Sequence, residues 1–452
     1  MQIDPRLRAL NRFGLGARPG ERTTIDAEAW LREQVHPAAA INPDSALSTT
    51  DAIIKTLAKT RSGAGMGQDR RQEIRQKGRE VAEREVLSAL THAITTTTPF
   101  AERLARFWSN HFAVSLQGEQ LIGYFAGAYE REAIRPHVFG RFEDMVLASA
   151  MHPAMLIYLD QTRSIGPNSK AGRNNGRGLN ENYARELLEL HTLGVDGGYT
   201  QNDVRQLALM LTGWTVGGLT RGRNTGARTT GGPKPFSFSE RLHEPARKVL
   251  LRRRFDEAGE QEGRGAILLL CQHPSTATFI ATKLVRHFVS DRPHPVDVDT
   301  IAHVFQRTGG DLRAVSLALL DLDSAFFGGE RKFRSPQEFI IAAARALALK
   351  RVDRGALKAL QSMRHAPWAP PSPAGYGDMV QDWADPDSLL RRADLAKALT
   401  RKMRRLRPDV RSILAETMEV PNPSVLVQLL DQQPDLNTQL ALLLASPDFQ
   451  WR

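Results

Sequence analysis

Apolar residues recur every three or four positions along most of the chain, a spacing that gathers them on one face of an α-helix. Segments of helical length with this spacing are 5–13, 26–35, 51–60, 72–94, 99–112, 118–134, 142–151, 181–193, 201–212, 275–289, 297–307, 311–322, 335–349, 388–405, 409–418, 424–431 and 436–445. Strand-like composition is found mainly at 235–239 and 248–251. The pattern predicts an all-α fold, a large multi-helix body with a minor β-hairpin near 235–251.

Residues typical of helix ends support this prediction. Thr200 and Asp203 have the spacing of a capping box, in which each side chain accepts a hydrogen bond from the backbone of the other residue. Gly213 follows the end of the same predicted helix. The segment 365–385 is rich in Pro, Trp and Gly, and we expect it to be a loop.

The length of 452 residues allows several domains or one large helical body. No repeat period is evident, so a solenoid is not predicted. We predict a single domain over 1–452, with an N-terminal half (1–160), a central region (161–255) and a C-terminal half (256–452). The content of 41% apolar and 25% charged residues is that of a folded protein.

The sequence shows few signals for membrane insertion or export. The longest apolar runs, such as 266–271 and 440–445, are far shorter than a membrane-spanning helix. The N-terminal residues form no signal peptide, which predicts a soluble, cytoplasmic protein and leaves export together with a partner open. Cys271, the single cysteine, lies in an apolar run, and we expect it to be a buried small hydrophobic residue.

The formal net charge of +11 raises the question of nucleic-acid binding. After neighbouring acids are taken into account, the excess of positive charge is concentrated in the loops 163–178 and 217–235 and in the cluster 247–254. Aromatic residues for base stacking do not alternate with these basic residues. We therefore expect anionic ligands generally, and only weak binding of nucleic acid, for which the segment 391–407 is the remaining candidate.

The predicted helix 181–193 carries the densest group of chemically capable side chains. Four of them fall on one arc of a helical wheel: Asn182, Arg185, Glu186 and Glu189. This arc is either a substrate-facing acid/base group or a salt-bridge network between packed helices, and the sequence leaves both interpretations open. His191 falls on the apolar side, and the Glu189–His191 spacing matches no helical metal motif. We therefore predict no metal site here, and we expect His191 to be a core residue.

A second group of polar residues lies on the predicted helix 275–289. Phe279, Lys283 and His287 are spaced i, i+4 and i+8 on a mostly apolar face. A lysine in this setting extends to solvent, pairs with a carboxylate or binds an anionic ligand. If it pairs, Glu186 or Glu189 is the expected partner.

Several segments together resemble a bacterial family catalogued as domain of unknown function 1800. The segments are 107–112 (Phe-Trp-Ser-Asn-His-Phe), 153–160, 180–194, 199–204, 211–214, His243 followed by Lys248, 279–288 and 444–449. One departure is Glu244-Pro245, where the family pattern has Asp followed by Gly. The resemblance implies a mostly helical single-domain protein, whose relatives often occur near a sulfatase-like family and are in some cases exported. It implies no established chemistry.

We predict an enzyme, a hydrolase or a transferase, that uses general acid/base chemistry on a polar, anionic or glycan-like substrate. The candidate catalytic residues are Glu186, Glu189, His111 and His243. The candidate substrate-binding residues are Asn182, Arg185, Lys248, Lys283 and Arg286. No metal or cofactor is assigned. There are two alternatives. One is a non-catalytic helical binding protein that is the partner of a sulfatase-like protein, and the other is a weak nucleic-acid binder.

Overall fold

Helices dominate the chain in the computed structural model, which describes residues 4–42, 44, 46–61, 68–175, 178–219, 235–401, 409–419 and 423–452. The first helices are α1 (Pro5–Arg8), a π-helix (Ala9–Phe13), α2 (Glu21–Thr24), α3 (Ala27–Arg32), a 3-10 helix (Pro37–Ala40), α4 (Thr50–Arg61), α5 (Gln68–Thr95), α6 (Pro99–His111), α7 (Ile122–Tyr129), a π-helix (Glu130–Ile134), a 3-10 helix (Arg135–His137), α8 (Phe142–Met151) and α9 (Pro153–Tyr158). These bounds follow the apolar periodicity closely.

The middle of the chain contains shorter elements. They are a 3-10 helix (Gln161–Arg163), α10 (Gly172–Asn175), α11 (Asn182–Glu186), a π-helix (Leu187–His191), α12 (Gln201–Leu211), β1 (Trp214–Val216), β2 (Phe236–Phe238), β3 (Lys248–Leu250) and β4 (Arg253–Phe255). The capping box of Thr200 and Asp203 is present at the start of α12. Gly213, which follows α12, has a φ of 90°, a conformation that favours glycine.

The last part of the chain is again helical. Its elements are α13 (Glu260–Cys271), α14 (Pro274–Phe288), α15 (Pro295–Thr308), α16 (Leu312–Leu320), α17 (Asp323–Phe327), α18 (Pro336–Ala346), α19 (Arg354–Ser362), a 3-10 helix (Val380–Asp382), α20 (Pro386–Thr400), α21 (Val410–Thr417), α22 (Pro423–Asp431), α23 (Leu436–Ala445) and a 3-10 helix (Asp448–Gln450). None of the described helices combines the length and the apolar character that a membrane crossing requires.

The prediction of a mostly helical fold with little strand is confirmed, but the pairing of the strands is different from the predicted hairpin. β2 pairs antiparallel with β1, and β3 pairs antiparallel with β4, so the two predicted strands belong to separate two-stranded sheets. Leu251 and Arg252 join β3 to β4 with φ of 48° and 64°, the tight reversal of a two-residue hairpin. Trp214 on β1 packs edge-on against Phe236 on β2, with ring centroids 5.3 Å apart.

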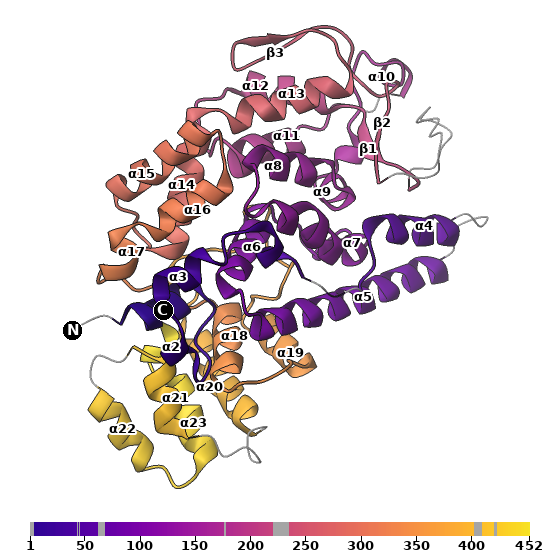
Figure 1. Ribbon diagram of the computed structural model, residues 1–452. Helices are drawn as coiled ribbons and strands as arrows, with labels where there is room; N and C mark the ends of the chain where they lie inside the picture. Colours follow the sequence, from indigo (N-terminus) through magenta and orange to yellow (C-terminus); the bar gives the residue numbers. More distant parts are fainter. Residues whose placement is uncertain are drawn as a thin grey trace.

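Two hydrophobic cores organise the helices. The first contains buried residues from Ala9 to Ala325, so it includes parts of all three predicted regions. The second is formed by α18 to α23 together with Leu15 and residues of α5 such as Leu90. Figure 1 shows α18 to α23 (orange to yellow) below α6, while α5 runs from α18 to the right, below α7 and α4.

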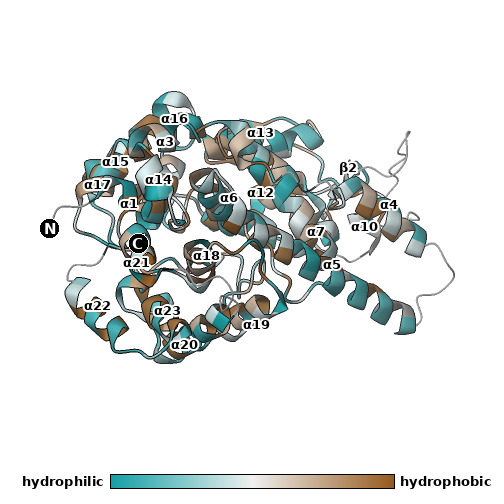
Figure 2. Ribbon diagram, turned by 60° about the horizontal axis from the view of Figure 1, so that its bottom comes forward, coloured by the Kyte–Doolittle hydropathy of each residue, from teal (hydrophilic) through white to brown (hydrophobic). Residues whose placement is uncertain are grey.

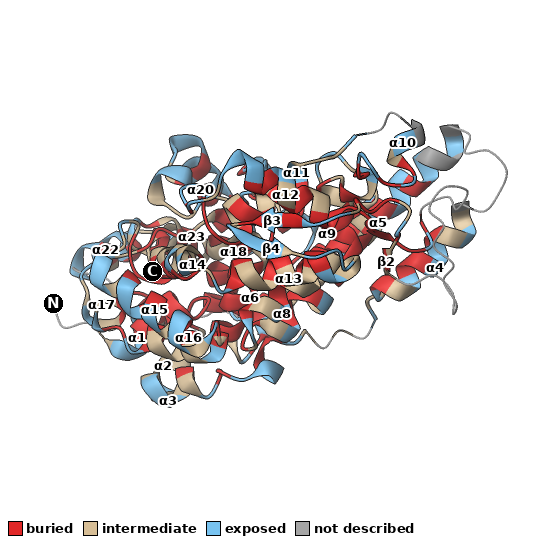
Figure 3. Ribbon diagram, turned by 90° about the horizontal axis from the view of Figure 1, so that it is seen from above, coloured by how far each residue is buried: buried red, intermediate tan, exposed pale blue. Residues whose placement is uncertain are grey.

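The solvent exposure of the residues follows the arrangement of the two cores. The part of α5 that extends away from the cores is mostly hydrophilic, as the teal colour in Figure 2 shows. Figure 3 shows buried residues (red) along α6 and α9 and exposed residues (pale blue) on outer helices such as α3 and α22. Cys271 at the end of α13 is buried, as its apolar surroundings predict.

Candidate functional site

A cavity of about 420 Å³ is lined by residues of both cores, within the size range of small-molecule sites. Its walls come from α6, α14, the start of α18 and the segment 365–382. Its charged and titratable lining residues are Arg103, Arg106, His111, Glu130, Lys283, Arg286, His287, Glu338, His365, Tyr376, Asp378 and Asp382. The structure thus brings together three of the predicted site residues, His111, Lys283 and Arg286.

Helix α14 supplies the cationic wall of the cavity. Its first turn is closed by His273, whose side chain accepts a hydrogen bond from Ser275, and by Pro274 at the first helical position. Lys283, Arg286 and His287 follow at i, i+3 and i+4, a spacing that places them side by side on one face. The other face of α14 is buried in the first core.

Lys283 is surrounded by protein, but its side chain is partly exposed because it faces the cavity. Its ammonium group lies 5.5 Å from the centre of the Phe279 ring and has no ion-pair or hydrogen-bond partner among the described residues. Burial lowers its pKa from 10.5 to about 8, an effect that Asp378 opposes and Arg286 strengthens. The sequence suggested Glu186 or Glu189 as the partner of Lys283. The carboxylate that acts on Lys283 is instead Asp378, which lies in the segment 365–382.

Arg286 also has no ion-pair partner within the described part of the chain. Its Nε is buried and donates no hydrogen bond to the described residues. The two other arginines of the cavity differ in this respect, since Arg103 pairs with Glu338 and Arg106 lies 3.7 Å from Glu102. Among the described residues, Lys283 and Arg286 are therefore the cations of this wall that no carboxylate pairs with.

His287 forms a hydrogen bond with Asp378, with 3.0 Å between Nδ1 and Oδ2. A carboxylate only accepts, so Nδ1 carries the proton and Nε2 keeps its lone pair. No partner of Nε2 is present among the described residues. Burial lowers the pKa of His287, although Asp378 opposes this effect, so the imidazole is neutral at pH 7. A neutral imidazole oriented by a carboxylate can act as a general base.

Asp378 stays ionised in this setting. Burial on its own raises the pKa of Asp378, but the charge and hydrogen bond of His287 and the charges of Lys332 and Arg452 outweigh burial and lower the pKa to about 2. The carboxylate therefore stabilises a proton on His287 whenever the imidazole accepts one.

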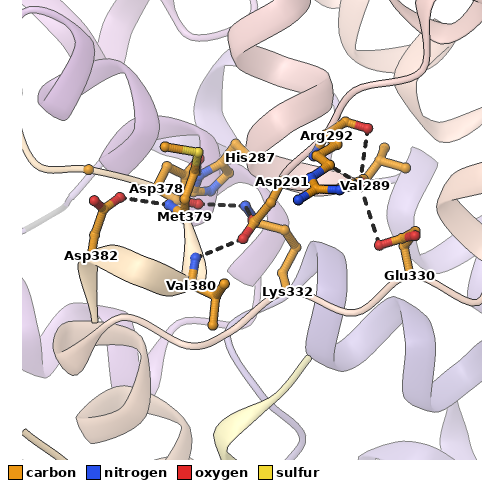
Figure 4. A network of polar contacts seen from close by, with 12 residues as sticks. His287, Val289, Asp291, Arg292, Glu330, Lys332, Asp378, Met379, Val380 and Asp382 are labelled. Carbon is orange, nitrogen blue, oxygen red and sulfur yellow. Dashed lines mark hydrogen bonds and ion pairs between the residues drawn. The ribbon is translucent and has the colours of Figure 1, made fainter. Parts of the chain in front are cut away.

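A network of polar contacts holds Asp378 in place (Figure 4). The ammonium group of Lys332 donates to the carbonyl oxygen of Asp378 over 2.5 Å and also pairs with Asp291. The second oxygen of Asp291 accepts a hydrogen bond of 2.7 Å from the backbone of Val380, and Asp382 accepts one of 2.9 Å from Met379. These contacts fix the backbone on both sides of the Asp378 side chain.

His111 is a second imidazole in the lining of the cavity. Its Nε2 lies 3.1 Å from the carbonyl oxygen of His191, so Nε2 donates and Nδ1 keeps its lone pair. Burial, and then the charge of Lys283, lower the pKa of His111 well below its usual range. His191 is itself buried, and burial followed by the charge of Lys283 lowers its pKa to about 3.

The predicted arc of Asn182, Arg185, Glu186 and Glu189 lies elsewhere. The lining of the cavity includes Leu190 of this helix but neither of the two glutamates. Arg185 pairs with Glu189 at 3.2 Å and with Gln201 at 2.8 Å, and its side chain remains 39% exposed. Burial, and then the charge of Glu189, raise the pKa of Glu186. Arg185 and Glu189 thus form a partly exposed ion pair within one helix.

His243 and Lys248 are also remote from the cavity lining, because both are bound to Glu262 on α13. The His243 Nε2 lies 3.1 Å from one Glu262 oxygen, and the Lys248 ammonium lies 2.7 Å from the other. All three side chains are buried. Burial raises the pKa of Glu262, but its hydrogen bonds with His243 and Lys248 outweigh this effect and lower it. The structure therefore makes these residues an internal ion cluster.

Glu244, which departs from the family pattern, has a local structural role. Its carboxylate accepts hydrogen bonds of 2.8 Å and 2.7 Å from the backbone and side chain of Asn168, which closes part of the basic loop 163–178. Residues 176–177 of this loop, 220–234 of the loop 217–235 and 402–407 of the segment 391–407 lie outside the described residues. Elsewhere in the basic regions, Arg163 pairs with Asp160 and Arg247 pairs with Asp256.

Sequence reasoning missed the acidic half of the cavity. Asp378, Asp382 and Glu338 were not among the candidates, and the segment 365–385 was expected only to be a loop. Nothing in the local sequence connects His287 with a residue 91 positions later. Among the described residues, no group of three or more His, Cys, Asp or Glu side chains is arranged to hold a metal ion.

The comparison with known families agrees with the resemblance. A family model described as "Protein of unknown function (DUF1800)" matches residues 8–451, so the chain belongs to this family. Neither a curated protein nor a solved structure matches the chain significantly.

Proposed function

We propose that this protein is an enzyme that uses general acid/base chemistry on a small anionic substrate bound in the cavity. The observation that carries the proposal is that the same cavity is lined by the His287–Asp378 pair and by two cations that have no ion-pair partner among the described residues. Lys283 and Arg286 bind the substrate's negative charge, and His287 transfers the proton. The sequence suggests Glu186 or Glu189 as the proton-transfer group. The proposed chemistry is the same, but the proton-transfer group is His287.

The surroundings of His287 suit this role. Asp378 orients the imidazole and stabilises its protonated form, as carboxylates do in many general-base pairs. The cavity is walled by Phe107 and Phe279 as well as by charged groups, and a partly apolar wall strengthens the electrostatic interactions inside it. His111 adds a buried imidazole to the cavity lining.

The experiment is a comparison of wild-type protein with His287→Gln and Asp378→Asn on a panel of phosphate monoesters, sulfate monoesters, hydroxy acids and uronic acids. Loss of a general base lowers kcat by about 10²–10⁴-fold. We expect that fall in His287→Gln with little change in substrate affinity. Turnover that persists in His287→Gln would contradict the proposed role.

The non-catalytic alternative gives a different result in the same experiment. A helical binding protein, such as the partner of a sulfatase-like protein, would bind anions through Lys283 and Arg286 without turning any of them over. Lys283→Met would then abolish binding, and His287→Gln would change nothing.

A further inference from the structure

We infer that the substrate of this cavity carries a sugar ring, and that the indole of Trp368 is the surface against which this ring lies. The inference rests on the proposed function and names the substrate class of the same site. Three features of the cavity support it, namely the way in which Trp368 is held, the size of the cavity and the balance of hydrogen-bonding groups in its lining.

Trp368 is held in place from several directions. Its indole Nε1 donates a hydrogen bond of 3.0 Å to Glu130, which is itself paired with Arg135. The carbonyl oxygen of Trp368 accepts a hydrogen bond of 2.7 Å from the backbone of Leu116. The side chain also packs against both hydrophobic cores. These contacts fix the plane of the indole before a ligand binds, so little conformational freedom is lost on binding.

The Trp368 backbone adopts a conformation that bulky residues avoid. Its φ is 50°, in the left-handed region. Such strain persists only where the surrounding contacts enforce it, and it is concentrated at active sites and ligand clamps. The residue is partly exposed and lines the cavity, and within the described part of the chain no other aromatic ring stacks on it. A ring of the ligand is therefore the expected partner of the indole.

The cavity is large enough to hold a ring beside an anionic group. Its volume of about 420 Å³ lies in the range of pockets that enclose drug-sized ligands, and an inorganic anion fills only a small part of it. Pro367 and Pro370 lie in the lining on either side of Trp368 in the sequence, and Phe279 lies in the α14 wall. These side chains suit a flat, apolar face of a ligand. A sugar ring has such a face, made of its C–H groups, and carries hydroxyl groups around its rim.

The hydrogen-bonding groups of the lining favour a sugar ring over an aromatic one. The charged side chains balance, with four cations and four carboxylates. Lys283 and Arg286 have no carboxylate partner among the described residues. Asp382 has no cation partner among them and accepts a hydrogen bond of 2.9 Å from the backbone of Met379. A hydroxyl group both donates and accepts hydrogen bonds, so the rim of a sugar satisfies the cations and the carboxylate together. An aromatic ring leaves these groups unsatisfied, which weakens binding.

The test compares sugar rings with open-chain polyols of the same charge. Glucuronate is compared with gluconate, both of which are monoanions, and methyl glucoside is compared with sorbitol, both of which are uncharged. Calorimetric titration of the wild type measures each affinity. We expect the ring compound of each pair to bind about 5- to 10-fold more tightly, the effect of one ring packed on an aromatic side chain. This comparison needs no variant, so it does not depend on how a substitution affects folding.

Three variants assign the ring preference to Trp368. Trp368→Leu removes the flat surface and should abolish the preference, whereas Trp368→Phe loses the hydrogen bond to Glu130 but keeps an aromatic face and should retain most of the preference. Trp30→Leu changes a partly exposed tryptophan of α3 that is outside the cavity lining, and it should behave like the wild type. A purely structural role of Trp368 would weaken the binding of both members of a pair equally.

The outcomes separate this inference from the proposed function. Equal affinities within both pairs, or a ring preference that survives in Trp368→Leu, overturn the inference, and the proposed function still stands if gluconate binding depends on Lys283. A preference that depends on Trp368, with equal affinities for glucuronate and methyl glucoside, supports the inference and contradicts the anionic substrate. Benzoate that binds more tightly than glucuronate would show that the ring is aromatic and overturn the sugar. Absence of binding of every probe at millimolar concentrations overturns both.

Discussion

Lys283 and Lys248 are both enclosed by protein, but among the described residues Lys248 pairs with a carboxylate and Lys283 does not. Replacing each lysine with methionine should therefore change the stability in opposite directions. Lys283 faces the cavity without a protein partner among the described residues. Lys248 is 2% exposed and lies 2.7 Å from Glu262. Methionine has a similar length and no charge, so each variant removes mainly the charge.

The magnitude for Lys283 follows from its pKa. A shift from 10.5 in the unfolded chain to about 8 in the folded protein corresponds to about 3 kcal/mol. The folded state binds the proton less tightly, so this cost is fully present below pH 8 and disappears as the pH rises through 10.5. The Lys283 side chain is partly exposed and also interacts with Phe279, which reduces the gain from its removal. We therefore expect Lys283→Met to raise the free energy of unfolding by about 1–3 kcal/mol at pH 7.

Lys248→Met should have the opposite effect. It leaves the Glu262 carboxylate buried with His243 as its remaining side-chain partner, and stranding one member of a buried ion pair costs about 3–5 kcal/mol. Denaturant unfolding of the wild type and both variants, at pH 7 and at several values between 8 and 10.5, measures both effects. The gain in Lys283→Met should shrink over that upper range. A loss of more than about 1 kcal/mol in Lys283→Met at pH 7 would refute the reasoning, because it would mean that the cation stabilises the fold.

Four further predictions concern the site and its surroundings. The affinity of the wild type for acetate, measured by calorimetry, should fall above about pH 8 as Lys283 loses its proton. Turnover should fall on the acidic side as His287 gains a proton, at a lower pH than for an ordinary histidine because burial lowers its pKa; a flat pH profile would exclude both groups. Glu186→Gln and Glu189→Gln should each change the stability by less than about 1 kcal/mol in thermal unfolding, and losses of several kcal/mol would show that these glutamates are structural. His191→Ala removes a buried ring and should cost about 3 kcal/mol, so an unchanged melting temperature would contradict its core position. DNA or RNA binding in a gel-shift assay should disappear by about 200 mM salt, and complexes that survive would favour the nucleic-acid alternative.

Local sequence patterns were sufficient for most of the helices. The predicted segments 142–151 and 436–445 coincide with α8 and α23, because an amphipathic period and clear end signals specify a helix without tertiary information. Helix α13 was missed, since Gly263 and Gly265 lower its helix propensity. Gly263 is required there because a Cβ would lie 2.6 Å from the Trp214 ring, a contact between elements far apart in the sequence.

The candidate site was predictable only in part, because contacts between segments far apart in the sequence decide which residues face each other. A lysine on an apolar helix face must find a partner or a ligand, so Lys283 could be identified from its own helix. The helical wheel also gave the correct side for Glu186 and Glu189, but it carries no information about which element lies opposite that side. Asp378 lies in a segment with little regular structure, and its contact with His287 depends on the packing of the whole chain.

The position of the cavity between the two cores connects ligand binding to the integrity of the entire molecule. Its walls include Leu15, Leu90, Lys283, Glu338 and Asp378, so unfolding of either core destroys the site. A ligand that binds only the intact cavity therefore stabilises both cores together, by about 2.7 kcal/mol at a concentration 100 times its Kd. A compound that binds the cavity should raise the melting temperature of the whole protein. A library can therefore be screened for ligands by melting temperature before the reaction is known.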